Sequence, residues 1–121
     1  MNFSEAIRSG FQNYANFTGR AQRSAFWYWI LFCFVAGLVT VAIDTAIFGA
    51  DGWMPLNSLF TLATIIPNLA VAARRLHDID RTGWWQLLHF IPLIGTIVLI
   101  IWWCSRGTPG INRFGPNPLG E

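Results

Sequence analysis

The sequence contains no lysine, and all eight of its basic residues are arginines. Charge of either sign is scarce: 12% of the 121 residues are charged, against about 25% in soluble domains. A soluble domain of this length needs more charge on its surface, so the scarcity argues against a soluble protein. A net charge of +2, without a basic run carrying interleaved aromatics, also predicts no nucleic-acid partner.

Cysteine is rare as well, and catalytic motifs are absent. Cys33 and Cys104 form no C-x-x-C motif and have no histidines at metal-ligand spacing. They fall in different hydrophobic segments at different expected depths, which predicts two free thiols. The sequence has no nucleophile motif, phosphate-binding glycine loop or pair of catalytic carboxylates. We therefore predict neither an enzyme nor a cofactor site.

Hydrophobic sequence is what the chain has in abundance, since 54% of its residues are hydrophobic and 16% are aromatic. Three apolar runs, residues 24–48, 54–73 and 84–104, are each long enough to cross a hydrocarbon core of about 30 Å. A pair of tryptophans stands at each end of the third run, as at membrane interfaces. We predict an all-α membrane protein, with residues 1–121 forming a single membrane domain.

The two ends of the chain differ from these runs. Residues 2–16 place Phe3, Ile7, Phe11 and Tyr14 on one helical face. This pattern predicts an amphipathic helix lying in the membrane interface, although it also suits a helix packed on the rest of the protein. The tail, residues 105–121, contains four glycines and three prolines. That composition predicts an irregular cap.

The distribution of arginine predicts the orientation. If all three runs cross, six arginines lie on the side of the amino terminus and two lie opposite. The positive-inside rule then places the amino terminus and the loop 74–83 in the cytoplasm. However, Pro92-Leu93-Ile94-Gly95 interrupts the third run. A re-entrant hairpin there would put all eight arginines on one side, but a kinked crossing is commoner, and we expect the crossing.

The loop 74–83 concentrates the charge. Asp78 or Asp80 can bridge to Arg20 or Arg23, which would lock the first two membrane helices together. Alternatively, the arginines act independently as insertion signals. No second histidine follows at i+4 to chelate a metal, so none is predicted. Arginines in excess of the aspartates would face anionic lipid phosphates. The candidate lipid- or partner-facing cluster consists of Arg20, Arg23, Arg74, Arg75, His77, Asp78, Asp80 and Arg81.

Three polar residues are predicted inside the membrane: Asp44, Asn68 and His89. An ionisable group there is a functional candidate by default, but Asp44 lies near a segment end, where snorkelling to water explains it. His89 suits an interhelical hydrogen bond. A polar line through Asn57, Thr61, Thr64 and Asn68 predicts either a permeation path or helix-packing contacts.

Four blocks of sequence resemble a known family. They are Gly19-Arg20-Ala21-Gln22-Arg23-Ser24-Ala25-Phe26-Trp27, Arg74-Arg75-Leu76-His77-Asp78-Ile79-Asp80-Arg81-Thr82-Gly83-Trp84-Trp85, Ile91-Pro92-Leu93-Ile94-Gly95, and Gly107-Thr108-Pro109-Gly110-Ile111-Asn112-Arg113-Phe114-Gly115-Pro116-Asn117-Pro118. Together they resemble the YhaH/YhaI-like family of small bacterial inner-membrane proteins, a domain of unknown function. Thr82 departs mildly, because the family often has serine there. The resemblance implies a multi-pass inner-membrane protein and supplies no catalytic residues, substrate or cofactor.

From these observations we expect a non-enzymatic interaction or accessory protein that acts through its arginine-rich cytoplasmic face. Its expected partners are membrane lipids, chiefly anionic ones, together with a second copy of the chain or another membrane protein. The competing hypothesis is an oligomeric protein for transport or permeation of a small solute or ion, because three helices alone hardly enclose a path.

Overall fold

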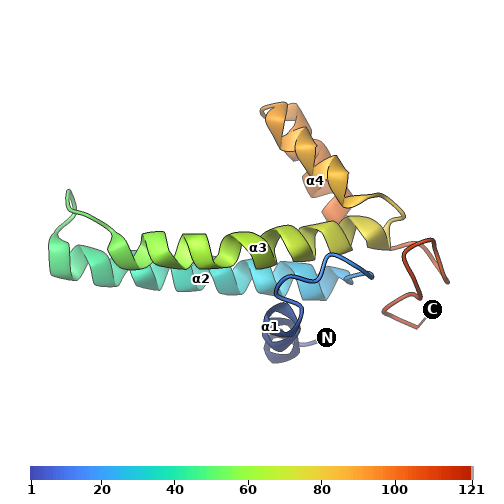
Figure 1. The fold of residues 1–121 in the computed structure, drawn as a ribbon, viewed down its shortest axis with the longest axis horizontal. Helices are drawn as coiled ribbons and strands as arrows, with labels where there is room; N and C mark the ends of the chain where they lie inside the picture. Colours follow the sequence, from blue (N-terminus) through green and yellow to red (C-terminus); the bar gives the residue numbers. More distant parts are fainter. Residues whose placement is uncertain (121) are drawn as a thin grey trace.

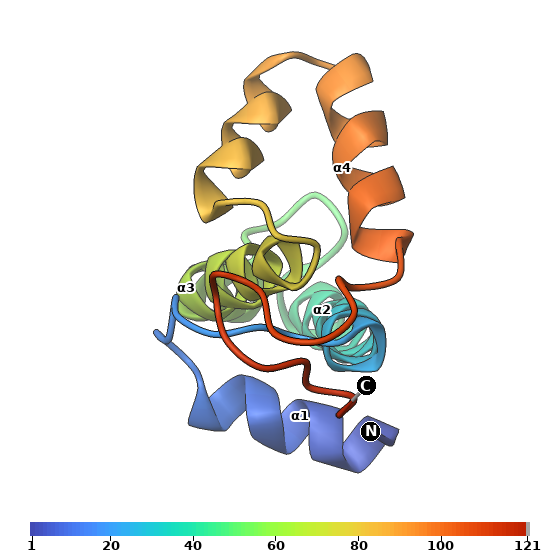
Figure 2. The ribbon, with the colours of Figure 1, turned by 90° about the vertical axis from the view of Figure 1, so that its right-hand side faces the viewer.

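The computed structural model describes residues 1–120, and its regular elements are helices. The elements are α1 (Phe3–Gln12), α2 (Arg23–Phe48), α3 (Pro55–Asp78), the 3-10 helix η1 (Gly83–Phe90) and α4 (Ile94–Cys104). α2 and α3 form a long antiparallel pair, and α1 crosses this pair on one side (Figure 1). η1 and α4 stand side by side and project from the opposite side (Figure 2).

α2 and α3 are the two helices long and apolar enough to cross a membrane. They contain 26 and 24 residues with mean hydropathies of 2.3 and 1.5, so each is about 36–39 Å long. Their outward faces carry large exposed side chains, such as Phe34 at 63%, Leu59 at 66% and Leu62 at 66%. The core helices of a soluble protein would bury these side chains, whereas a bilayer accepts them. The predicted segments 24–48 and 54–73 are thus present as helices, and α3 continues five residues farther.

Polar side chains hold α2 against α3 at several depths. Trp29 Nε1 donates to Asn68 Oδ1 at 2.8 Å, and Thr40 Oγ1 donates to Asn57 Oδ1 at 2.9 Å. Asp44 is buried, and its carboxylate accepts the backbone N–H groups of residues 56 and 57 at 3.2 and 2.8 Å. Asp44 therefore caps the amino terminus of α3 from the neighbouring helix. The snorkelling explanation for Asp44 is wrong, because the side chain is buried and its carboxylate accepts hydrogen bonds from backbone N–H groups instead of reaching water.

α1 is a ten-residue helix docked on α2, and it is shorter than the predicted 2–16. Asn2 and Glu5 form a capping box at its start. Gly10 lies directly on the indole of Trp29, where a Cβ would overlap the ring. Phe11 contacts the same indole edge-on, with ring centres 5.2 Å apart, yet it is 55% exposed. The alternative of a helix packed on the protein is therefore observed, while its aromatic face also stays available to lipid.

The third apolar run, expected to form a kinked crossing helix with a re-entrant hairpin as the alternative, consists of two separate legs, η1 and α4. The chain reverses at residues 91–93, where Leu93 adopts a left-handed backbone conformation with φ of 65°. Gly95 then allows close approach of the two legs, because a Cβ there would overlap the Leu88 carbonyl oxygen. We call residues 83–104 the η1–α4 hairpin. The two tryptophan pairs, expected about 28 Å apart, meet at its base, with the rings of Trp85 and Trp102 5.5 Å apart.

Candidate functional site

The candidate site is the end of the α2–α3 pair where four parts of the chain meet. They are the α1–α2 connection (13–22), the last turn of α3, the base of the η1–α4 hairpin and the tail (105–120). The tail folds back across this end in both views of the ribbon (Figures 1 and 2). Seven of the eight arginines belong to these parts or adjoin them, and Arg8 lies on the crossing helix α1. We call this region the arginine-rich end.

Asp78 is the centre of the region. Its Oδ1 accepts Arg20 Nε at 2.8 Å and its Oδ2 accepts Arg75 Nη1 at 2.6 Å. The side chain of Arg20 is 1% exposed, that of Arg75 is 0% exposed and that of Asp78 is 3% exposed. Two buried guanidinium groups thus share one buried carboxylate, with net charge +1. We call this trio the Asp78 lock. Of the bridges expected between Asp78 or Asp80 and Arg20 or Arg23, the structure contains the one between Asp78 and Arg20.

Backbone carbonyls satisfy the remaining donors of the lock. The Arg20 guanidinium donates to the carbonyls of Thr108 at 2.6 Å and Gly110 at 2.7 Å. The Arg75 guanidinium donates to the carbonyls of Trp103 at 3.0 Å, Ala21 at 3.2 Å and Ser105. Arginine suits this role because its planar fork presents five donors in fixed directions. The lock therefore ties the tail, the hairpin base and the α1–α2 connection to α3.

The tail fits closely over the lock and is an ordered cap. Gly107 lies against the carboxylate of Asp78, and a Cβ there would overlap it. Thr108 N donates to the Asp78 carbonyl at 2.7 Å. The Phe114 ring stacks on the His77 ring with centres 4.1 Å apart and planes 1° apart. These contacts make residues 107–114 part of the site.

The other charged side chains of the region are placed differently. Arg23 and Arg113 are exposed, and Arg113 pairs with Asp80 at 3.2 Å on the surface. Arg81 stacks on the indole of Trp102, its guanidinium carbon 4.1 Å from the ring centre. Arg74 is buried at 5% exposure, and its Nε has no hydrogen-bond partner within residues 1–120. The predicted cluster is thus one buried lock surrounded by peripheral charges.

His77 and His89 occupy separate places. His77 Nδ1 lies 2.8 Å from the carbonyl oxygen of Gly19, so Nδ1 carries the proton and donates. His89 lies on the hairpin, where its Nδ1 is 3.5 Å from Thr96 Oγ1 across the two legs. In the part of the chain that the structure covers, no three His, Cys, Asp or Glu side chains gather at metal-binding distance.

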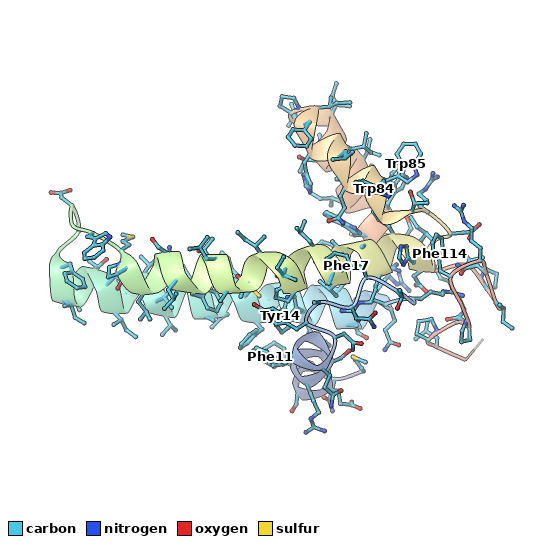
Figure 3. All side chains as sticks on the ribbon, viewed as in Figure 1. Phe11, Tyr14, Phe17, Trp84, Trp85 and Phe114 are labelled. Atoms are coloured by element: carbon cyan, nitrogen blue, oxygen red, sulfur yellow. The ribbon has the colours of Figure 1, made fainter. Side chains whose placement is uncertain are left out.

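Aromatic side chains surround the arginine-rich half of the α2–α3 pair. Figure 3 shows Phe11 and Tyr14 on the side of α1, Trp84 and Trp85 on the side of the hairpin, and Phe114 near the tail. Tryptophan and tyrosine favour the depth of the lipid headgroups. This arrangement therefore marks one level of the molecule as an expected membrane interface.

Sequence comparisons place the chain among inner-membrane proteins. Residues 14–116 match the family described as "Protein of unknown function (DUF805)". The chain is 43% identical over 114 residues to inner membrane protein YhaH of Escherichia coli K12, covering 91% of this chain and 93% of that protein. It is 44% identical over 108 residues to inner membrane protein YhaI of the same organism, covering 88% and 89%. No solved structure matches the chain significantly.

Proposed function

We propose, given that the chain belongs to the DUF805 family, that it is a non-enzymatic interaction protein of the bacterial inner membrane that binds anionic lipid headgroups. The observation that carries this proposal is the division of the arginines. Arg20 and Arg75 are buried and both pair with Asp78 within the Asp78 lock. Arg8 and Arg23 are exposed, and Arg81 lies partly exposed on the tryptophans of the hairpin base. The lock builds the end of the molecule, and these outer arginines meet the lipid.

Charge supports a cytoplasmic position for the arginine-rich end. Seven of the eight arginines belong to this end or adjoin it, because the hairpin returns the tail to it, and Arg8 lies on α1, which precedes the first long helix. The turn between α2 and α3, at the far end, carries Asp51 and no basic residue. The positive-inside rule therefore favours both termini in the cytoplasm. α2 and α3 then cross the membrane, and the η1–α4 hairpin enters the cytoplasmic leaflet with exposed apolar residues such as Phe90 and Leu93 at its tip.

The outer arginines fit anionic phosphates by chemistry and by depth. Each arginine near a negative leaflet contributes about 1 kcal/mol of attraction, and its fork can hold a phosphate through two hydrogen bonds. The polar line of α3, by contrast, gives little support to a permeation path. Asn57 and Asn68 bond to α2, and the hydroxyls of Thr61 and Thr64 bond to carbonyls of their own helix.

Native mass spectrometry of the purified protein tests the lipid proposal. Wild type, presented with equal amounts of phosphatidylglycerol and phosphatidylcholine, should retain mainly phosphatidylglycerol, and less of it as salt rises. The variant Arg8→Gln/Arg23→Gln/Arg81→Gln should lose that preference. The matched lysine variant should keep part of it, because lysine keeps the charge but lacks the fork. Equal retention of both lipids by wild type would overturn the proposed function.

A further inference from the structure

A groove of about 630 Å³ runs between the carboxy-terminal half of α3 and η1. Leu69, Ala73 and His77 of α3 form one wall, and Leu87 of η1 forms part of the other. Phe17 and Phe114 border the groove from the α1–α2 connection and the tail. Figure 3 shows Phe17 at this half of α3, Trp84 on the side of the hairpin and Phe114 nearer the tail.

The groove runs along the helix that crosses the membrane. Leu69, Ala73 and His77 are spaced at i, i+4 and i+8, so they share a face and cover about 12 Å of helix. The Leu69 end lies toward the apolar middle of α3. The His77 end lies at the arginine-rich end, where lipid headgroups are expected. The long axis of the groove is therefore parallel to the acyl chains of a bilayer.

The lining of the groove suits a hydrocarbon chain. Side chains such as Leu69, Ala73 and Leu87 make it almost wholly apolar, as binding an acyl chain requires. The groove follows α3 for about 12 Å, so an extended chain can lie in it lengthwise.

Two arginines lie near the His77 end of the groove. His77 itself is 7% exposed, and its Nδ1 is bound to the Gly19 carbonyl. Arg113 stands over the Phe114 ring at 4.9 Å. Arg74 lies one turn before His77 and lacks a partner for its buried Nε. Asp80 is the counter-charge for Arg113 alone, which leaves an excess of positive charge for an anionic group.

We propose that this groove binds one acyl chain of an anionic phospholipid, with the phosphate at the His77 end. The inference rests on the proposed function, because it gives the lipid at the arginine-rich end a defined binding site. It adds that the chain of the lipid is held by specific residues. The outer arginines alone would attract headgroups to the surface without placing a chain anywhere.

A photoreactive lipid tests this placement. The full-length protein is reconstituted in vesicles containing phosphatidylglycerol that carries a diazirine halfway along one acyl chain, and cross-linked peptides are identified by mass spectrometry. We expect cross-links concentrated on the α3 and η1 residues of the groove. A phosphatidylcholine with the same diazirine chain should label the groove much less.

Filling the groove should abolish this labelling. Leu69 is 43% exposed, so Leu69→Trp can fill the groove without disturbing the helix pair. Leu62→Trp is the matched control, because Leu62 lies two turns earlier on α3, is 66% exposed and does not line the groove. Leu87→Trp fills the groove from η1, should Leu69→Trp fail to fold as judged by its melting temperature. Groove cross-links should fall to background in the filled variant and persist in Leu62→Trp.

The outcomes separate this inference from the proposed function. Wild type that retains phosphatidylglycerol but cross-links evenly along its apolar faces would overturn the groove and leave the lipid-headgroup function standing. Equal groove labelling by the two lipid probes would overturn the anionic ligand assigned here. Groove cross-links that persist in the Arg8→Gln/Arg23→Gln/Arg81→Gln variant would support the groove as a lipid-binding site that does not depend on the outer arginines.

Discussion

Replacing Asp78 with alanine should destabilise the protein far more than replacing its surface neighbour Asp80. Asp78→Ala leaves two buried guanidinium groups without a counter-charge, since Arg20 and Arg75 are 1% and 0% exposed. Removing one partner of a buried ion pair costs about 3–5 kcal/mol. Both arginines keep carbonyl acceptors from the tail and the hairpin base, so we expect a cost within that range rather than twice it.

Asp80→Ala is the surface control two residues away. Asp80 has a left-handed φ of 62°, which alanine adopts less readily than aspartate, so its measured cost is an upper bound on that of the exposed pair. Asp80 pairs with Arg113 at 3.2 Å, but their side chains are 46% and 58% exposed. An exposed pair contributes about 0–1 kcal/mol, because water solvates both charges and salt screens them. Asp78→Asn should fall between the two alanine variants, since the amide oxygen still accepts one arginine while its charge is lost.

The assay is unfolding in detergent micelles, followed by tryptophan fluorescence during titration with a denaturing detergent. A second measurement is the rate at which trypsin cuts after Arg106 and Arg113, which should rise in Asp78→Ala because the tail loses its anchor. If Asp78→Ala and Asp80→Ala unfolded at the same midpoint and were cut at the same rate, the lock would have no structural role.

Three further predictions follow from the packing. Gly10→Ala should detach α1 from α2, because the new methyl group overlaps the indole of Trp29. Gly37→Ala meets nothing within 4 Å of its Cβ and should raise the free energy of unfolding by about 0.5–1 kcal/mol. The unfolding midpoints of the two variants test this difference. Asp44→Ala should cost at least the 0.5–2 kcal/mol of a lost helix cap, against no measurable change for Asp51→Ala, and equal midpoints would contradict the cap. A single cysteine at Asn117 in a cysteine-free background should resist an impermeant thiol reagent added outside cells, and ready labelling would refute the cytoplasmic tail.

Hydropathy predicted the α2–α3 pair well, because both helices are apolar runs long enough to span a membrane. The second membrane segment was predicted to end at residue 73, and α3 continues as a helix to Asp78. Charged residues normally end such a run, but Arg75 and Asp78 pair with each other at i, i+3 and continue the helix. The bridge between Asp78 and Arg20 was predictable from opposite charges expected in one leaflet.

The hairpin was not predictable from hydropathy, because the mean hydropathy of residues 84–104 is the same whether they form one crossing helix or two half-length legs. Pro92 alone is compatible with a kinked helix. The deciding features are the left-handed Leu93 and the close approach at Gly95, both of which are properties of the backbone. The carbonyl partners of the lock escaped prediction for a similar reason, because every residue has a carbonyl group and its position depends on the fold.

The Asp78 lock also explains why the third apolar run folds back as a hairpin. Arg75 holds the carbonyls of Trp103 and Ser105 at the end of α3, so α4 must finish where η1 begins. α4 has 11 residues and is about 16 Å long, about half of a hydrocarbon core. Returning the tail changes the arginine count from six against two to eight against none. In the topology proposed above, the contacts that fold this end therefore place all eight arginines on the side that the positive-inside rule assigns to the cytoplasm.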